Sequence, residues 1–136
     1  MKKNFIDEYV EINGIQQYFL HFQGQAGAPV VLIIHGGPGS SESIFAYEIE
    51  KEWAGDYSIV YFDQRGAGKT FAKNKSAPVT MELMQQDLLE TILYLRKKYN
   101  QEKIILLGHS FGTALGALLA KQHPEYVLAY IGMSQV

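Results

Sequence analysis

A serine between two glycines, in the segment Gly108-His109-Ser110-Phe111-Gly112, has the residue types and spacing of a catalytic nucleophile. An unbroken apolar run precedes this segment, and small and apolar residues at helical spacing follow it. The pattern predicts a buried strand, a tight turn and a helix. Glycine on both sides allows a sharp reversal, so we expect the hydroxyl of Ser110 to stand clear of the sheet, where it can attack a substrate.

Two other glycine-rich segments directly follow predicted apolar strands. They are residues 35–39, His-Gly-Gly-Pro-Gly, and residues 63–68, Asp-Gln-Arg-Gly-Ala-Gly. Because open α/β folds bind ligands beyond the carboxyl ends of their parallel strands, we expect all three segments to meet at one site. The backbone N–H groups of Gly37 and Phe111 are our candidates for the two donors of an oxyanion hole.

In this order and spacing, the three motifs resemble the α/β-hydrolase superfamily and, within it, the proline iminopeptidases; the resemblance runs from the N-terminal strands to Val136. It implies a serine hydrolase that cleaves N-terminal aminoacyl amide bonds of small peptides through an acyl-enzyme on Ser110. We expect no cofactor and no metal. Proline iminopeptidases usually carry Gly-Gly-Ser-Trp-Gly at the serine turn, from which this chain departs. The residues expected to support the site are His35, Gly36, Gly39, Asp63, Gln64, Arg65, Gly108, His109 and Gly112.

Two other functions remain open for the same sequence. One is a carboxylesterase or lactonase with the same site, acting on a small ester. The other, from a different class, is a noncatalytic module that associates with a second copy of itself through its final strand.

Residues 66–70, Gly-Ala-Gly-Lys-Thr, end like a phosphate-binding loop. Such a loop needs glycine where Asp63 stands, and the residues after Thr70 do not predict a helix, so we reject nucleotide binding. We expect Asp63 and Arg65 to form a structural hydrogen-bonded pair between neighbouring loops.

The rest of the chain alternates predicted strands and helices that would hold these loops. Asn13-Gly14, whose residues tolerate positive φ, predicts a type I′ hairpin between strands at 9–12 and 15–22. Thr80 predicts the N-cap of a helix over 81–99. Further strands are expected at 30–34, 58–62, 104–107 and 127–133, further helices at 44–53 and from 112 to before Pro124, and a mobile polar loop at 69–78. The pattern predicts an α/β fold, with a doubly wound, mostly parallel sheet fronted by an antiparallel hairpin.

Composition limits the function classes. With 136 residues, of which 47% are hydrophobic, the chain is sized for one globular domain. Its net charge of −2 offers no basic surface, which argues against nucleic acid and anionic membranes as partners. The absence of cysteine excludes disulfides and thiolate metal sites. No signal peptide or spanning run is recognisable, so we expect a cytoplasmic protein.

None of the four histidines is expected to be the catalytic base. His109 is adjacent to the nucleophile and should point elsewhere, and His35 should order its own loop. His21 lies in the predicted hairpin, and His123 at a helix C-terminus is most simply a favourable contact with the helix dipole.

The catalytic acid and base of this fold follow the nucleophile along the chain. After Ser110 the only acidic residue is Glu125 and the only histidine is His123, both at the end of the helix behind the serine. We therefore expect residues 1–136 to be the N-terminal part of a single α/β-hydrolase domain, nearly inactive alone, with the acid and histidine beyond Val136. The final strand is apolar on both faces, which predicts a covering strand or a second copy.

Overall fold

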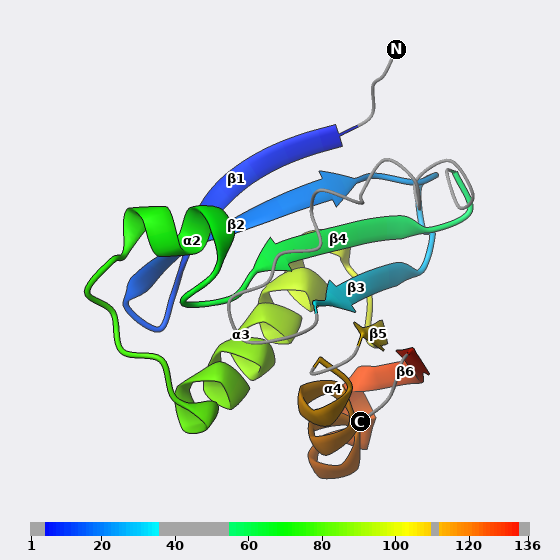
Figure 1. Ribbon diagram of the computed structural model, residues 1–136. Helices are drawn as coiled ribbons and strands as arrows, with labels where there is room; N and C mark the ends of the chain where they lie inside the picture. The colour runs from blue at the N-terminus through cyan, green and yellow to red at the C-terminus, as the bar shows by residue number, and fades with distance from the viewer. Residues whose placement is uncertain (1–4, 36–54, 110–111, 134–136) are drawn as a thin grey trace.

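The computed structural model describes residues 5–35, 55–109 and 112–133. Within these ranges, six strands form one mixed sheet in the order β1-β2-β4-β3-β5-β6 (Figure 1). The strands are β1 (Phe5–Ile12), β2 (Ile15–Phe22), β3 (Val30–Ile34), β4 (Ser58–Asp63), β5 (Ile104–His109) and β6 (Val127–Met133). The helices are α2 (Gly68–Lys73), α3 (Met81–Tyr99), α4 (Gly112–Gln122) and the short 3₁₀ helix η2 (Pro124–Tyr126).

The sheet is antiparallel at its N-terminal edge and parallel elsewhere, which confirms the predicted α/β class. Strands β1 and β2 form a hairpin, and β2 pairs antiparallel with β4. Strands β4, β3, β5 and β6 are parallel neighbours. Asn13 and Gly14 both have positive φ, 50° and 86°, as the predicted type I′ turn requires.

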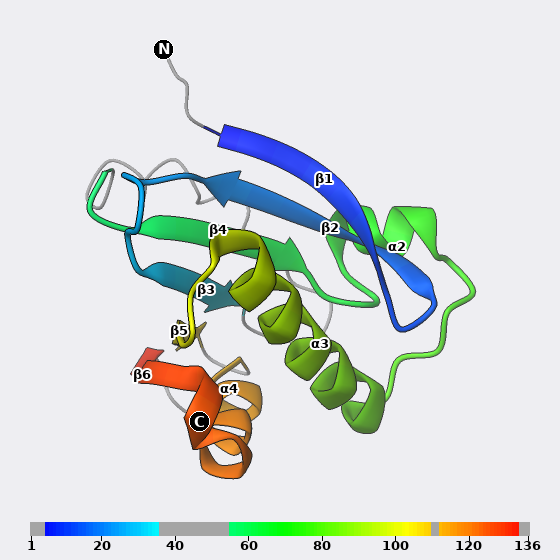
Figure 2. The ribbon, with the colours of Figure 1, turned by 180° about the vertical axis from the view of Figure 1, so that it is seen from behind.

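The central parallel strands β3, β4 and β5 are largely apolar because both of their faces are buried. Alternate residues such as Leu32 and Leu106 pack against α3 and α4, which lie on the same side of the sheet (Figures 1 and 2). The residues between them, such as Ile33 and Leu107, belong to a second apolar cluster on the opposite face.

Helix α3 begins and ends as predicted. The Thr80 hydroxyl accepts a hydrogen bond from the Leu83 N–H at 3.1 Å, which caps the first turn. Asn100 follows the last helical residue in the left-handed region, with φ of 52°. The predicted helix at 44–53 lies outside the described residues.

The expectation of a mobile loop over 69–78 is wrong in its first half, because residues 68–73 form α2. Asp63 accounts for this helix: its carboxylate accepts the Lys69 N–H at 2.9 Å, and its carbonyl accepts the Thr70 hydroxyl. The Thr70 Oγ1 in turn accepts the Tyr18 N–H of β2 at 2.9 Å. A helix therefore does begin within the Gly-Ala-Gly-Lys-Thr segment, at Gly68, against expectation. The Asp63 carboxylate accepts a hydrogen bond at the N-terminus of this helix, where a phosphate would have to bind.

Strand β6 forms one edge of the described sheet. Leu128 and Ile131 are 56% and 44% exposed there, which is unusual for large apolar side chains in a strand. Covering of this edge by a further strand or by a second copy stays a prediction. No helix in the described part of the chain is long and apolar enough to span a membrane.

Candidate active site

Three neighbouring parallel strands bring the predicted site loops to one edge of the sheet. Strand β3 lies between β4 and β5, and the register pairs Ile33 with Tyr61 and Ile34 with Gly108. The segments that begin at His35, Asp63 and His109 therefore leave the sheet side by side, as the sequence predicted.

The predicted nucleophile turn is described by the residues on either side of it, because Ser110 and Phe111 lie outside the described residues. Strand β5 ends at His109 and α4 begins at Gly112, so strand changes to helix across those two positions. A Cβ atom on Gly108 would lie 2.8 Å from the Gly112 carbonyl oxygen and 2.9 Å from the Thr113 Cα. The two ends of the turn are thus in backbone contact, which only glycine at position 108 permits.

His35 connects the loop after β3 to the loop after β4. Its Nε2 accepts a hydrogen bond from the Gln64 backbone N–H at 3.0 Å, and the Gln64 side-chain Nε2 is 3.5 Å from the His35 carbonyl oxygen. Both side chains are buried. Because a backbone N–H can only donate, Nε2 of His35 carries no proton in this arrangement. His35 thus holds the loop after β4, and the expectation that it orders its own loop stays a prediction, because Gly36, Gly37 and Gly39 lie outside the described residues.

The predicted pair between Asp63 and Arg65 is wrong, because Arg65 pairs with Asp87 of α3. The Arg65 Nε donates to Asp87 Oδ2 at 2.6 Å, and its Nη2 donates to Asp87 Oδ1 at 3.2 Å. Its Nη1 donates to the Pro78 carbonyl at 2.9 Å. Arg65 and Asp87 are each 3% exposed, so this is a buried, bidentate ion pair.

Asp87 is the residue that sequence reasoning missed. The signal was present, because Asp87 shares the buried stripe of α3 with Met84 and Leu88, whereas the other two acids of the helix, Glu82 and Glu90, are exposed. A carboxylate on an apolar stripe requires a partner for its charge.

The other described histidines have structural surroundings. His21 is buried in β2, with Nε2 2.7 Å from Glu8 Oε2 and Nδ1 2.7 Å from the Tyr99 hydroxyl. Burial lowers the pKa of His21, and the neighbouring Glu8 carboxylate opposes part of that shift. His123 lies 3.3 Å from Glu125 at the end of α4, on the surface. His109 is the last residue of β5 and is partly buried.

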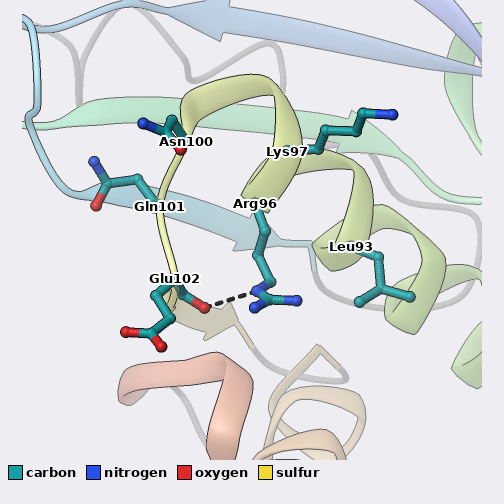
Figure 3. A pocket seen from close by; sticks show the side chains of 6 residues that line it. All are labelled: Leu93, Arg96, Lys97, Asn100, Gln101 and Glu102. Carbon is teal, nitrogen blue, oxygen red and sulfur yellow. Dashed lines mark hydrogen bonds between the residues drawn. The ribbon is translucent and has the colours of Figure 1, made fainter.

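The described residues contain no group of three or more histidine or acidic side chains arranged to hold a metal ion. A pocket of about 470 Å³ lies at the C-terminal end of α3 and is lined by Leu93, Arg96, Lys97, Asn100, Gln101 and Glu102 (Figure 3). The Arg96 Nε donates there to the Glu102 carbonyl at 2.7 Å. These residues lead into the amino end of β5, so this pocket is separate from the edge that carries the site loops.

Comparison with known proteins agrees with the fold. The sequence pattern of the α/β hydrolase fold matches residues 29–135, and the chain therefore belongs to this family. The chain is 29% identical over 128 residues to a proline iminopeptidase of Heyndrickxia coagulans, covering 93% of this chain and 42% of that protein. It is 32% identical over 126 residues to protein phosphatase methylesterase 1 of Candida albicans, covering 90% of this chain and 32% of that protein.

A crystal structure with the same fold is that of a proline iminopeptidase-related protein from Thermus thermophilus. It superposes with a TM-score of 0.80 at 24% identity, covering 98% of this chain and 45% of that one. The chain thus spans about a third to somewhat under half the length of these three proteins.

Proposed function

We propose that this chain supplies the nucleophile and the oxyanion donors of a serine hydrolase that cleaves N-terminal aminoacyl amide bonds. The observation that carries the proposal is the turn between β5 and α4. There, Gly108 and Gly112 are in backbone contact on either side of Ser110, next to the end of β3. Such a strand-to-helix turn presents a serine hydroxyl above the carboxyl edge of the sheet.

In the proposed reaction, the Ser110 Oγ attacks the carbonyl carbon of the substrate as a base removes its proton. The N–H groups of Gly37 and Phe111 stabilise the oxyanion, each contributing about 3 to 4 kcal/mol to the transition state. The amine leaves, and water then hydrolyses the acyl-enzyme. The hydrogen bond that the Gln64 N–H donates to His35 supports this proposal, because His35 directly precedes the segment that contains Gly37.

The proposed base is not among the four histidines of this chain. His21 and His35 are buried and hydrogen-bonded to other groups, His21 to Glu8 and Tyr99 and His35 to the Gln64 N–H. His123 faces Glu125 beyond the C-terminal end of α4. His109 precedes the nucleophile directly and has too short a connection to face its hydroxyl from the substrate side. We therefore assign the acid and the base of the triad to residues outside positions 1–136, and expect these 136 residues alone to be nearly inactive.

Two substrate classes compete for the proposed site. Similarity to the proline iminopeptidase of Heyndrickxia coagulans favours an N-terminal aminoacyl amide as the substrate, with proline as the first residue to test. The methylesterase of Candida albicans supports a small ester as the second candidate, since the same acyl-enzyme forms from either bond.

The test is a substrate panel on the protein expressed from its natural reading frame. Proline arylamide, other aminoacyl arylamides and short aryl esters are compared by kcat/KM, and faster turnover of arylamides supports the aminopeptidase. Ser110→Ala should reduce turnover about a millionfold, to background, whereas Ser76→Ala, on the exposed loop before α3, should match the wild type. Equal turnover by wild type and Ser110→Ala would contradict the proposal.

A further inference from the structure

Asp87 accepts hydrogen bonds from two distant parts of the chain. Besides the two donors of Arg65, its Oδ1 accepts the side-chain Nδ2 of Asn13 at 3.0 Å. Asn13 lies at the tip of the β1-β2 hairpin, in the left-handed region that the turn requires. One buried carboxylate on α3 therefore holds both the hairpin tip and the loop after β4.

The loop after β4 is held on its other side by His35. Gln64 and Arg65 are consecutive residues, yet the Gln64 N–H donates to His35 while the Arg65 guanidinium binds Asp87. A turn follows at once, because the Ala67 N–H donates to the Gln64 carbonyl at 2.9 Å. The contact with His35 and the contact with Asp87 are made by adjacent residues, so a movement of Arg65 should also move the Gln64 N–H that binds His35.

We propose that Asp87 is a positioning residue for the hydrolase reaction. Its carboxylate holds Arg65, the Arg65 loop presents the Gln64 N–H, and this N–H holds His35, the residue directly before Gly36 and Gly37. The inference rests on the proposed function, since His35 matters for catalysis only if the segment that it precedes supplies an oxyanion donor. Asp87 itself touches neither the substrate nor the nucleophile.

The charge of Asp87 is what distinguishes this role from simple packing. Asp87→Asn keeps the shape of the side chain, but it leaves the buried Arg65 cation without its counter-ion and replaces one acceptor oxygen by a donor. Because a buried charge without a counter-ion is unfavourable, we expect the Arg65 side chain to move toward water and to shift the neighbouring Gln64. Glu90→Gln is the matched control, because Glu90 is an acid of the same helix on its exposed face.

The experiment measures three quantities on the protein expressed from its natural reading frame. They are the hydrogen-exchange rate of the Gln64 amide, the ¹⁵N shift of His35 Nε2, and kcat and KM on the best substrate. For Asp87→Asn we expect exchange at Gln64 to be about tenfold faster while the Leu106 amide in β5 is unchanged, and the ¹⁵N signal to shift toward that of a free imidazole nitrogen. We expect kcat to fall about 10- to 100-fold with KM within about twofold.

A second variant covers the case in which Asp87→Asn does not fold. Arg65→Lys keeps the charge but loses the forked geometry, so it should show the same pattern at smaller amplitude, and Asp87→Glu should restore part of kcat. Unchanged exchange at Gln64 and an unchanged His35 signal in a folded variant would overturn the coupling. Faster exchange with unchanged kcat would overturn the positioning role.

Failure of the proposed function gives a different result. A wild type that hydrolyses no member of the panel contradicts the function, whereas the exchange rate and the ¹⁵N shift still decide whether Asp87 controls His35.

Discussion

Gly112 lies so close to Ile34 that a Cβ atom on residue 112 would be 2.2 Å from the Ile34 carbonyl oxygen. The same atom would be 2.7 Å from the His35 carbonyl oxygen, so the first residue of α4 sits directly on the end of β3. Both contacts are with backbone, which cannot rotate away as a side chain can. This close approach fixes the first residue of α4 against the end of β3.

Gly112→Ala should therefore push α4 away from β3. We expect a loss of about 3 kcal/mol in the free energy of unfolding, the upper end of the range for overpacking, measured by urea denaturation. Gly116→Ala is the matched control on the same helix. Its Cβ would meet the Tyr130 ring at 2.8 Å and the Ile34 Cδ1 at 3.2 Å, which are side-chain atoms that can shift, and alanine favours the helix by about 1 kcal/mol. Equal losses for the two variants would contradict the account.

Breaking the buried ion pair should destabilise the protein more than removing it. Arg65→Met leaves Asp87 buried without its counter-ion, which should cost about 3 to 5 kcal/mol. Combining Arg65→Met with Asp87→Leu removes both charges, so we expect part of the loss to be recovered. The measurement is the urea midpoint of the two single variants and the double variant. Strictly additive losses would show that the two side chains do not act as a pair.

Acid should destabilise the hairpin through His21. Because burial lowers the pKa of His21 from its ordinary value of 6.5, the unfolded chain binds a proton at a higher pH than the folded chain does. The stability due to neutral His21 is therefore complete above about pH 6.5 and is lost progressively as the pH falls from there toward the lowered value. Burial raises the pKa of Glu8, but hydrogen bonds from Tyr94 and His21 outweigh it, so the net shift is downward from 4.5 and acts at lower pH.

The check is the free energy of unfolding at several values between about pH 7 and about pH 5. His21→Asn should lower stability at neutral pH by about 1 to 3 kcal/mol and flatten the pH dependence, because a buried hydrogen-bonded group is lost. His123→Asn, on the surface beside Glu125, should keep the slope of the wild type. A slope unaffected by His21→Asn would contradict this assignment.

Thr70 should be essential for placing the Asp63 loop against the hairpin. Its buried hydroxyl donates to the Asp63 carbonyl and accepts the Tyr18 N–H. Thr70→Val preserves shape but removes the hydroxyl that bonds two backbone groups, so we expect a loss of about 1 to 3 kcal/mol in thermal or urea unfolding. Thr70→Ser retains the hydroxyl and should lose less. A valine variant more stable than the serine variant would show that packing of the methyl group dominates.

The strands could be predicted from sequence because their burial is continuous. Leu32 and Ile33 point to opposite faces of β3, and both faces are covered, so the run contains no polar residue to obscure the pattern. The meeting of the three glycine-rich loops at one edge of the sheet then follows from the rule that ligand-binding loops come after the carboxyl ends of parallel strands, whereas the strand order does not.

The two corrected features depend on contacts that the sequence does not display. Helix α2 is six residues long and polar, so it shows no apolar period, and it is held by Asp63 and by Tyr18 of a separate strand. The sequence suggests the neighbouring Asp63 as the partner of Arg65, whereas the packing of α3 against the sheet brings Asp87, 22 positions away, into contact with it. The sequence shows that Arg65 is charged, but the identity of its partner depends on the fold.

The most direct test of the account is covalent labelling of the nucleophile. The protein expressed from its natural reading frame is treated with a fluorophosphonate, and the adduct is located by intact mass and peptide mapping. We predict one adduct, on Ser110, that is absent from Ser110→Ala and slowed in Asp87→Asn. An adduct on another residue, or no adduct on a protein that hydrolyses the substrate panel, would contradict the assignment of Ser110 as the nucleophile.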